Sequence, residues 1–270
     1  MKNNGIQEKL IALCNRIEIP EVLINHIIEL SSDFCMPLRN LYKHFETYAS
    51  VMEFKAELVN DIYNFKILTC MLMLTLYVEK EYYKVGISEE VYLDTFKCFS
   101  RYLKESLDSY GLYKFDREWW VHRQLNMKIF RLGELEYEMT TFSNQNIVSI
   151  HIPSDANLDN SKCHYSYNLA KCFFEEYFPN YKYEFFVCDS WLLSPVLDKL
   201  LSQDSNILKF KNDFHIKSYD ENNSSFMKWI YKKENLEYKD LSEETTLQRN
   251  VRRHLMNGGK IGRAIGYLKI

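Results

Sequence analysis

Paired cysteines are the first feature that this 270-residue chain lacks. Its seven cysteines stand singly, with no C-x-x-C pair and no cysteine and histidine cluster at zinc-binding spacing, which excludes the common zinc modules. We therefore expect reduced thiols in the core of a cytoplasmic protein. The alternative is a reactive thiol, for which Cys163 and Cys188 are the candidates.

A surplus of positive charge is missing as well. The chain has 34 basic and 37 acidic side chains and a pI near 6.2, whereas a dedicated nucleic-acid-binding protein usually carries a basic surface. We therefore expect no nucleic-acid partner for the chain as a whole. The last 26 residues differ, because they hold no acid and six cations, namely Arg249, Arg252, Arg253, Lys260, Arg263 and Lys269. These cations could bind a polyanion; the alternative is that they are solvated or pair with the acids of "LEYKDLSEE".

No hydrophobic run is long enough to cross a membrane. The longest, "ILTCMLMLTLYV" at 67–78, would rise about 18 Å as a helix, against a hydrocarbon core of roughly 30 Å. We expect a buried helix there and no membrane partner. The N-terminal "MKNNGIQEKL" is polar where a signal peptide needs an apolar stretch, so nothing in it predicts export.

The hydrophobic pattern changes its period near the middle of the chain. From residue 6 to about 110, apolar residues recur at three- and four-residue spacing, which predicts a bundle of about five helices, one of them capped by Ser88. Beyond that, short strands are expected at 127–139, 146–152, 183–189 and 209–219, with a helix at 161–178. The sequence thus predicts an α+β protein with a helical domain at 1–110, a boundary near Gly111, and a mixed-sheet domain at 111–270.

Four segments of the second half carry a family resemblance. In order they read "FRLGELEYEM", "IVSIHIPSDANL", "CDSWLLSPVLDKLLSQDSNILKF" and "TTLQRNVRRHLMNGGKIGRAIGYL". This series resembles a bacterial two-domain family of acyltransferase-domain proteins. In that family, a helical N-acyltransferase N-terminal domain precedes a domain similar to the GNAT (Gcn5-related N-acetyltransferase) fold. The resemblance covers the second half well and the helical half more loosely.

The resemblance implies acetyl-CoA or another acyl-CoA as co-substrate. In GNAT enzymes two parallel strands splay apart, the acyl-pantetheine chain lies in the gap like an extra strand, and the pyrophosphate sits at the start of the next helix. Here the strands would be 147–152 and 183–189, with Ile150 and Ile152 along the thioester tail. The acceptor would be a small-molecule or peptide amine.

The expected phosphate-binding loop departs from the family pattern. That pattern is Arg or Gln followed by a glycine-rich turn, which lets backbone N–H groups approach the phosphates. This chain has "PSDANLDNSK", with no glycine and with Asp155 and Asp159. Carboxylates at a helix start ordinarily cap the helix themselves. CoA then binds elsewhere or weakly, or the activity has been lost. Arg249 and Arg253, one turn apart on a helix expected from Glu243, are candidates for its phosphates.

The expected sheet offers two candidates for a general base. Alternation along the expected strand places Glu134, Glu136 and Glu138 on one face, and Glu136 would take the proton from the attacking amine. His151 lies near the strand end where an open sheet has its ligand cleft, and a histidine suits base chemistry at neutral pH. The alternatives are a solvated acidic face and a structural histidine.

The segment "CDSWLLSP" ends the other splayed strand. Ser190 is a candidate donor to the leaving thiolate, while Asp189, Trp191 and Glu134 are candidates for acceptor binding. Helix capping by Asp189 or Ser190 and core packing of Trp191 are the alternatives.

Two functions remain open at this point. The first is an acyl-CoA-dependent N-acyltransferase in which backbone N–H groups of the splayed strand stabilise the oxyanion. The second is a catalytically silent GNAT-like module that binds a ligand or a protein. Nucleic-acid binding would require Arg249, Arg252 and Arg253 to share one exposed face.

Overall fold

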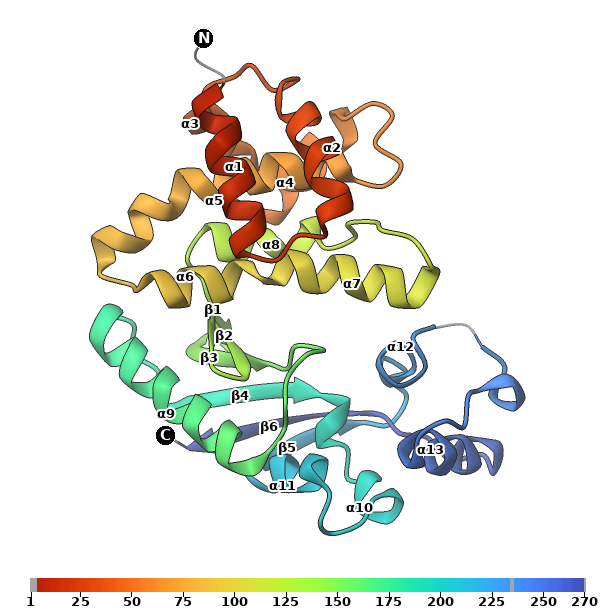
Figure 1. Cartoon of the computed structure of the whole chain (residues 1–270). Coiled ribbons are helices and arrows are strands. Elements are labelled where there is room, and N and C mark those ends of the chain that lie inside the picture. The colour runs from red at the N-terminus through yellow and green to blue at the C-terminus, as the bar shows by residue number, and fades with distance from the viewer. Residues whose placement is uncertain (1–3, 234–235, 270) are drawn as a thin grey trace. The chain divides into compact units, whose positions relative to one another are not determined.

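The computed structural model describes residues 4–233 and 236–269, which form two compact units (Figure 1). The first is Met1–Arg131 and the second is Leu132–Ile270. Helices make up most of the first unit, and the second contains most of a six-stranded sheet whose first strand begins at Ile129. The predicted α+β class, with a helical part followed by a mixed-sheet part, is confirmed.

The first unit is more finely divided than the expected bundle of about five helices. Its longest helix, α5, contains the apolar run 67–78, and the hydroxyls of Thr69 and Thr75 donate to carbonyl groups four residues earlier. No helix among the described residues is long and apolar enough to cross a bilayer. Ser88 caps α6 as expected, accepting a hydrogen bond from the Val91 N–H. The helices are α1 (Asn4–Arg16), α2 (Glu21–Ser31), α3 (Leu38–Tyr42), α4 (Tyr48–Glu57), α5 (Phe65–Val85), α6 (Glu89–Phe96), α7 (Cys98–Tyr110) and α8 (Glu118–Leu125).

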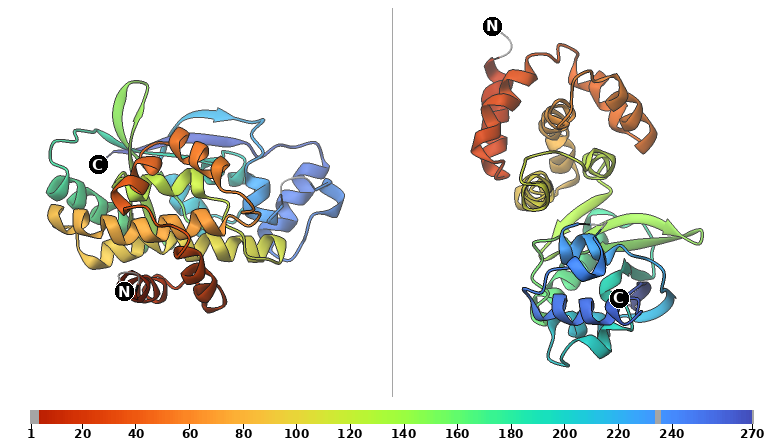
Figure 2. Two further views of the ribbon diagram at one scale, coloured as in Figure 1. Left: turned by 90° about the horizontal axis from the view of Figure 1, so that it is seen from above. Right: turned by 90° about the vertical axis from the view of Figure 1, so that its right-hand side faces the viewer.

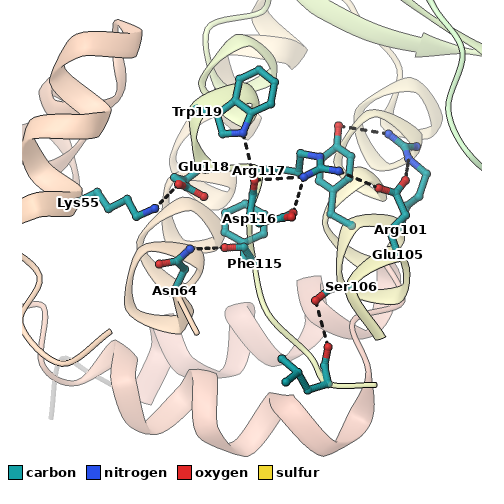
Figure 3. A network of polar contacts seen from close by, with 12 residues as sticks. Lys55, Asn64, Arg101, Glu105, Ser106, Phe115, Asp116, Arg117, Glu118 and Trp119 are labelled. Carbon is teal, nitrogen blue, oxygen red and sulfur yellow. Dashed lines mark hydrogen bonds and ion pairs between the residues drawn. The ribbon is translucent and has the colours of Figure 1, made fainter. Parts of the chain in front are cut away.

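The segment that follows α7 is held to the helices of the first unit by hydrogen bonds and an ion pair (Figure 3). Gly111, where we expected the first half to end, is the C-cap of α7 with φ of +72°. Phe115 is fully buried; its N–H donates to Tyr63 O and its carbonyl accepts from Asn64 Nδ2 at 2.6 Å. Glu118 then pairs with Lys55. These contacts keep the chain in the first unit through α8.

The strands of the second unit are hydrogen-bonded in the order β1-β2-β3-β4-β6-β5. The pair β3/β4 is parallel, and β2/β3, β4/β6 and β5/β6 are antiparallel. The tip of the β2–β3 hairpin projects beyond β4 (Figure 2) because β3 begins three residues before its first pair with β4. The strands are β1 (Ile129–Leu132), β2 (Leu135–Phe142), β3 (Gln145–His151), β4 (Phe185–Ser190), β5 (His215–Asp220) and β6 (Arg263–Lys269).

Two of the predicted strands were partly wrong. The expected strand 127–139 is broken by a turn at Gly133, whose φ is +69°, so β1 and β2 are separate strands. The expected strand 209–219 begins instead as helix α11 (Asn206–Asn212), and only its end forms β5. The Ser205 hydroxyl starts α11 by accepting the Ile207 N–H, a local signal that outweighs the apolar pattern.

Helix α9 (Asn160–Tyr177) covers one face of the sheet. The hydroxyls of Tyr137 on β2 and Ser166 on α9 lie 2.9 Å apart in the buried layer between them. A second core lies in the segment between β4 and β6, where Trp191 packs with residues of α12 (Phe226–Tyr231) and α13 (Thr246–Met256). The remaining elements are η1 (Lys43–Phe45), η2 (Trp191–Leu193), α10 (Leu197–Leu200) and η3 (Tyr238–Asp240).

Candidate active site

The two central parallel strands stop pairing before they end. The ladder between β3 and β4 joins Val148, Ser149 and Ile150 to Phe186, Val187 and Cys188, and among the described residues it goes no further. His151 continues to pair outward with β2, and Asp189 and Ser190 continue to pair outward with β6. The carboxyl ends of β3 and β4 therefore diverge, and this is the edge of an open sheet at which a ligand crevice forms.

A polar face of the sheet adjoins this divergence. Residues directly opposite in a ladder point to the same side, so Glu136 of β2 and its partner His151 of β3 share one face, together with Glu138. His151 Nε2 lies 2.8 Å from Glu138 Oε2. A carboxylate bonded to one ring nitrogen selects the tautomer and orients the ring. Glu136 is buried beside this pair.

Asp189 brings a second carboxylate to the same face. It lies two residues beyond Val187, the parallel partner of Ser149, and therefore on the side of His151. Burial raises the pKa of Asp189, while the electrostatic interactions with Arg263 and His151 lower it. Arg263 Nη2 lies 2.7 Å from Asp189 Oδ2. Asp189 is thus held by a cation of the neighbouring strand β6.

Other predicted site residues lie apart from the polar face. Ser190 follows Asp189 and by alternation points to the opposite side; its hydroxyl accepts the Leu192 N–H at the start of η2. Trp191 is 9% exposed and belongs to the core between β4 and β6, against which Ile152 also packs. Ile150 is buried and is the last residue of β3 that pairs with β4.

Glu134 does not continue the acidic stripe of β2. It lies in the turn between β1 and β2, where its Oε2 accepts the Asn157 N–H at 2.8 Å and its Oε1 lies 3.2 Å from Lys162 Nζ. The start of α9 is capped by Asp159, as the sequence predicted. Asp159 Oδ1 accepts the N–H groups of Ser161 at 3.0 Å and Lys162 at 3.4 Å.

Several of the C-terminal cations have acidic or carbonyl partners. Arg252 pairs with Glu243 at 2.7 Å, and Arg249 donates to the carbonyls of Glu243 and Glu244. Lys260 and Arg263 pair with Glu221 and Asp189. Arg252 therefore pairs with an acid of the stretch "LEYKDLSEE", as one interpretation of the sequence predicted, while Lys260 and Arg263 pair with acids elsewhere in the chain.

Arg249 and Arg253 lie one turn apart on α13, as predicted, and both are exposed. Val251 and Leu255 occupy the buried face of the same helix. The side chain of Arg252 is 26% exposed and engaged with Glu243, so the three arginines do not form one free basic face. A role of Arg249 and Arg253 in binding CoA phosphates stays a prediction.

Two residues of this arrangement were missed in the sequence. Glu138 was part of the predicted acidic stripe, but only the register of β2 on β3 places it, rather than Glu136, against the His151 ring. Arg263 was counted among the C-terminal cations, but only the pairing of β6 with β4 brings it to Asp189. No local motif marks either pair, because the partners lie 13 and 74 residues apart in the chain.

Comparison with known proteins agrees with this geometry. The family described as GNAT-like C-terminal domain matches residues 129–268, and the family described as N-acyltransferase N-terminal domain matches residues 8–127. No curated protein matched the chain.

Solved structures of acyltransferases have the same fold. An acyltransferase in complex with decanoyl-CoA and teicoplanin is 20% identical, with a TM-score of 0.80 over 96% of this chain and 86% of that one. An acyltransferase variant in complex with octanoyl-CoA is also 20% identical, with a TM-score of 0.80 over 97% of this chain and 88% of that one. At 20% sequence identity, this structural similarity shows only that the chains share a fold.

Proposed function

The chain belongs to the family of proteins with a GNAT-like C-terminal domain, and we propose that it is an acyl-CoA-dependent N-acyltransferase that acts on an amine. The observation that carries this proposal is the divergence of β3 and β4 beyond Ile150 and Cys188. Main-chain groups at a strand edge bind an extended chain as an additional strand. A thioester tail entering there would end beside the polar face that holds His151 and Glu138.

The reaction needs one base on that face. The Glu138 carboxylate holds the His151 ring, and the neutral imidazole takes the proton of the attacking amine. The amine nitrogen forms a bond to the thioester carbon, and the carbon–sulfur bond breaks. The CoA thiolate leaves and takes up the proton. Glu138 stabilises the imidazolium formed on the way.

Backbone groups and side chains near the diverging strand ends are placed to assist this reaction. Backbone N–H groups at the diverging strand ends are suited to hold the oxyanion of the tetrahedral intermediate. Glu136 is buried opposite His151 and is the second candidate base. Asp189 and Arg263 are candidates for contacts with the acceptor, since they lie on the same face as His151. Ser190 remains a candidate donor to the thiolate from the strand end.

The acceptor class follows from this chemistry and from the neighbours. A base next to a thioester suits a neutral amine nucleophile, and one similar acyltransferase structure contains teicoplanin. We propose a small-molecule or peptide amine as acceptor.

The proposal is tested by measuring thiol release from acetyl-CoA, octanoyl-CoA and decanoyl-CoA with a panel of amines including teicoplanin. We expect thiol release that depends on the amine, and a melting temperature that rises with donor concentration. His151→Asn should abolish most of the turnover. His164→Asn is the matched control, because His164 on α9 also pairs with a carboxylate, Asp213, at 3.2 Å but lies outside the polar face.

A catalytically silent binding module is the second candidate, and the self-capped start of α9 favours it, because Asp159 occupies the N–H groups that a phosphate would need. The two functions separate cleanly. A donor-dependent rise of the melting temperature without thiol release from any donor and amine would favour the silent module. The absence of both a thermal response and thiol release with every donor would contradict the transferase and leave a silent module that binds another ligand or a protein.

A further inference from the structure

Three aromatic rings and one lysine form a cluster on the sheet of the second unit. The rings of Phe185 on β4 and Tyr267 on β6 lie 5.3 Å apart between their centroids. Lys217 Nζ on β5 lies 5.3 Å from the centroid of the Phe142 ring and 5.6 Å from that of the Tyr267 ring. The three rings are half-buried and the lysine is exposed. We call these four residues the aromatic–lysine cluster.

The strand register places this cluster on the same face of the sheet as His151. Tyr267 pairs with Val187 in the β4/β6 ladder, and Val187 pairs with Ser149 in the β3/β4 ladder. Residues directly opposite in a ladder point to the same side, and so do residues two positions apart on one strand. His151 lies two residues after Ser149 and Phe185 lies two residues before Val187. Both rings therefore lie on the polar face.

A β-bulge lies at the lysine of the cluster. The pairing of β5 with β6 shifts its register between Ile216 and Ser218, so Lys217 has no direct partner in the ladder. Bulges change the direction of a side chain and are frequent next to active sites. Here the ammonium contacts the ring of Phe142, which lies four residues after Glu138 on β2 and on the same side. No acid among the residues that the structure describes forms an ion pair with Lys217.

The length of β4 sets the spacing between this cluster and the proposed base. Asp189, near the end of β4, interacts electrostatically with His151. Phe185 starts the same strand on the same face, four residues earlier. At a rise of about 3.3 Å per residue, the two ends of this face are about 13 Å apart. An extended peptide of about four residues spans that distance. An acceptor with its amine at His151 would therefore place its fourth residue, or an equivalent group, on the aromatic–lysine cluster.

We propose that the acceptor is an amine that carries an aromatic ring and a carboxylate about 13 Å from its nitrogen, with the ring on Phe185 and Tyr267 and the carboxylate on Lys217. This inference rests on the proposed N-acyltransferase function and names its acceptor class. Aromatic faces bind a further ring by stacked or edge-on contact, and an ammonium pairs with a carboxylate. The cluster binds the acceptor and takes no part in the bond changes of the transfer.

The test compares three tetrapeptides as acceptors from octanoyl-CoA: Gly-Gly-Gly-Phe, its C-terminal amide, and Gly-Gly-Gly-Leu. We expect kcat/KM for Gly-Gly-Gly-Phe to exceed that of its amide about 5-fold, because the amide cannot pair with the ammonium. It should exceed that of the leucine peptide about 5-fold as well, through ring contacts. Equal values for the three peptides would overturn the inference, and so would transfer to other amines but to none of these peptides. No transfer to any amine would instead overturn the proposed function.

Two variants connect these preferences to the cluster. Lys217→Met keeps an aliphatic stem without the charge, and the ratio of kcat/KM for the acid to that for the amide should fall to about 1. Tyr267→Leu should lower the preference for phenylalanine over leucine in the same way. Each ratio compares two acceptors on one protein sample, so partial loss of folded enzyme does not change it. Lys209→Met removes an exposed charge of α11, outside the cluster, and should leave both ratios unchanged. An undiminished preference for the acid in Lys217→Met would contradict the inference.

Discussion

His151 Nε2 and Glu138 Oε2 lie 2.8 Å apart across the antiparallel ladder of β2 and β3, although the direct partner of His151 in that ladder is Glu136. The contact is therefore diagonal, and it places a histidine and an orienting carboxylate on the face that adjoins the diverging strand ends. The proposed proton transfer depends on this pair.

Replacing Glu138 by Gln tests the pair directly. The amide can still contact the ring but carries no charge to stabilise the imidazolium, so we expect kcat to fall about 10- to 100-fold. Steady-state assays with a saturating amine measure this fall. Asp213→Asn, at the His164 pair on α9, serves as control. An unaltered kcat in Glu138→Gln would show that the carboxylate does not assist His151.

The ion pair of Lys55 and Glu118 stabilises the first unit. The Glu118 side chain is 4% exposed and pairs with Lys55 across the segment that follows α7 (Figure 3). Lys55→Met leaves a buried carboxylate without its cation and should lower the free energy of unfolding by about 3 kcal/mol. Urea denaturation followed by circular dichroism measures this change.

The matched control is Lys84→Met, because Lys84 and Glu81 form an exposed pair at 3.0 Å that should contribute less than about 1 kcal/mol. The double variant Lys55→Met/Glu118→Leu should recover most of the lost stability. If Lys55→Met and Lys84→Met lowered the free energy of unfolding equally, burial would not make the Lys55–Glu118 pair more important for stability.

Gly262, just before β6, requires glycine for two reasons. Its φ is +71°, and a Cβ there would lie 2.6 Å from Asp220 O and from the Tyr219 ring. Gly262→Ala should lower the free energy of unfolding by about 2–4 kcal/mol. Gly258 also has positive φ but nothing within 4 Å, so Gly258→Ala should cost about 1 kcal/mol. Thermal denaturation of the two variants side by side tests the difference, and similar melting temperatures would contradict it.

The cysteines predict a selective reaction with a thiol reagent. Cys35 and Cys172 are exposed, whereas the other five are buried. Burial raises the pKa of Cys163 to about 12 and raises that of Cys188 further. At pH 8 the thiolate fraction of Cys163 is then about 10⁻⁴. We expect two thiols to react quickly with DTNB in the folded protein and seven in denaturant. Fast labelling of Cys163 or Cys188, identified by mass spectrometry, would restore the reactive-thiol alternative.

Much of the architecture was predictable because its signals are local. Apolar periodicity distinguished the helical half from the mixed-sheet half, and side chains next to helix starts predicted the caps Ser88 and Asp159. The predictions failed where local signals compete. Ser205 starts a helix inside an expected strand, and Gly133 divides another.

The features of the candidate site can likewise be separated into those that the sequence predicts and those that it does not. The sequence by itself determined which residue types stand at the strand ends, that the start of α9 caps itself, and that no glycine-rich loop follows β3, since each depends on residues a few positions apart. The tertiary structure alone decided that His151 contacts Glu138, that Arg263 holds Asp189, and that β3 and β4 separate beyond Ile150. Strand register and the order of strands in a sheet come from the packing of distant segments, and no local pattern of side chains specifies them.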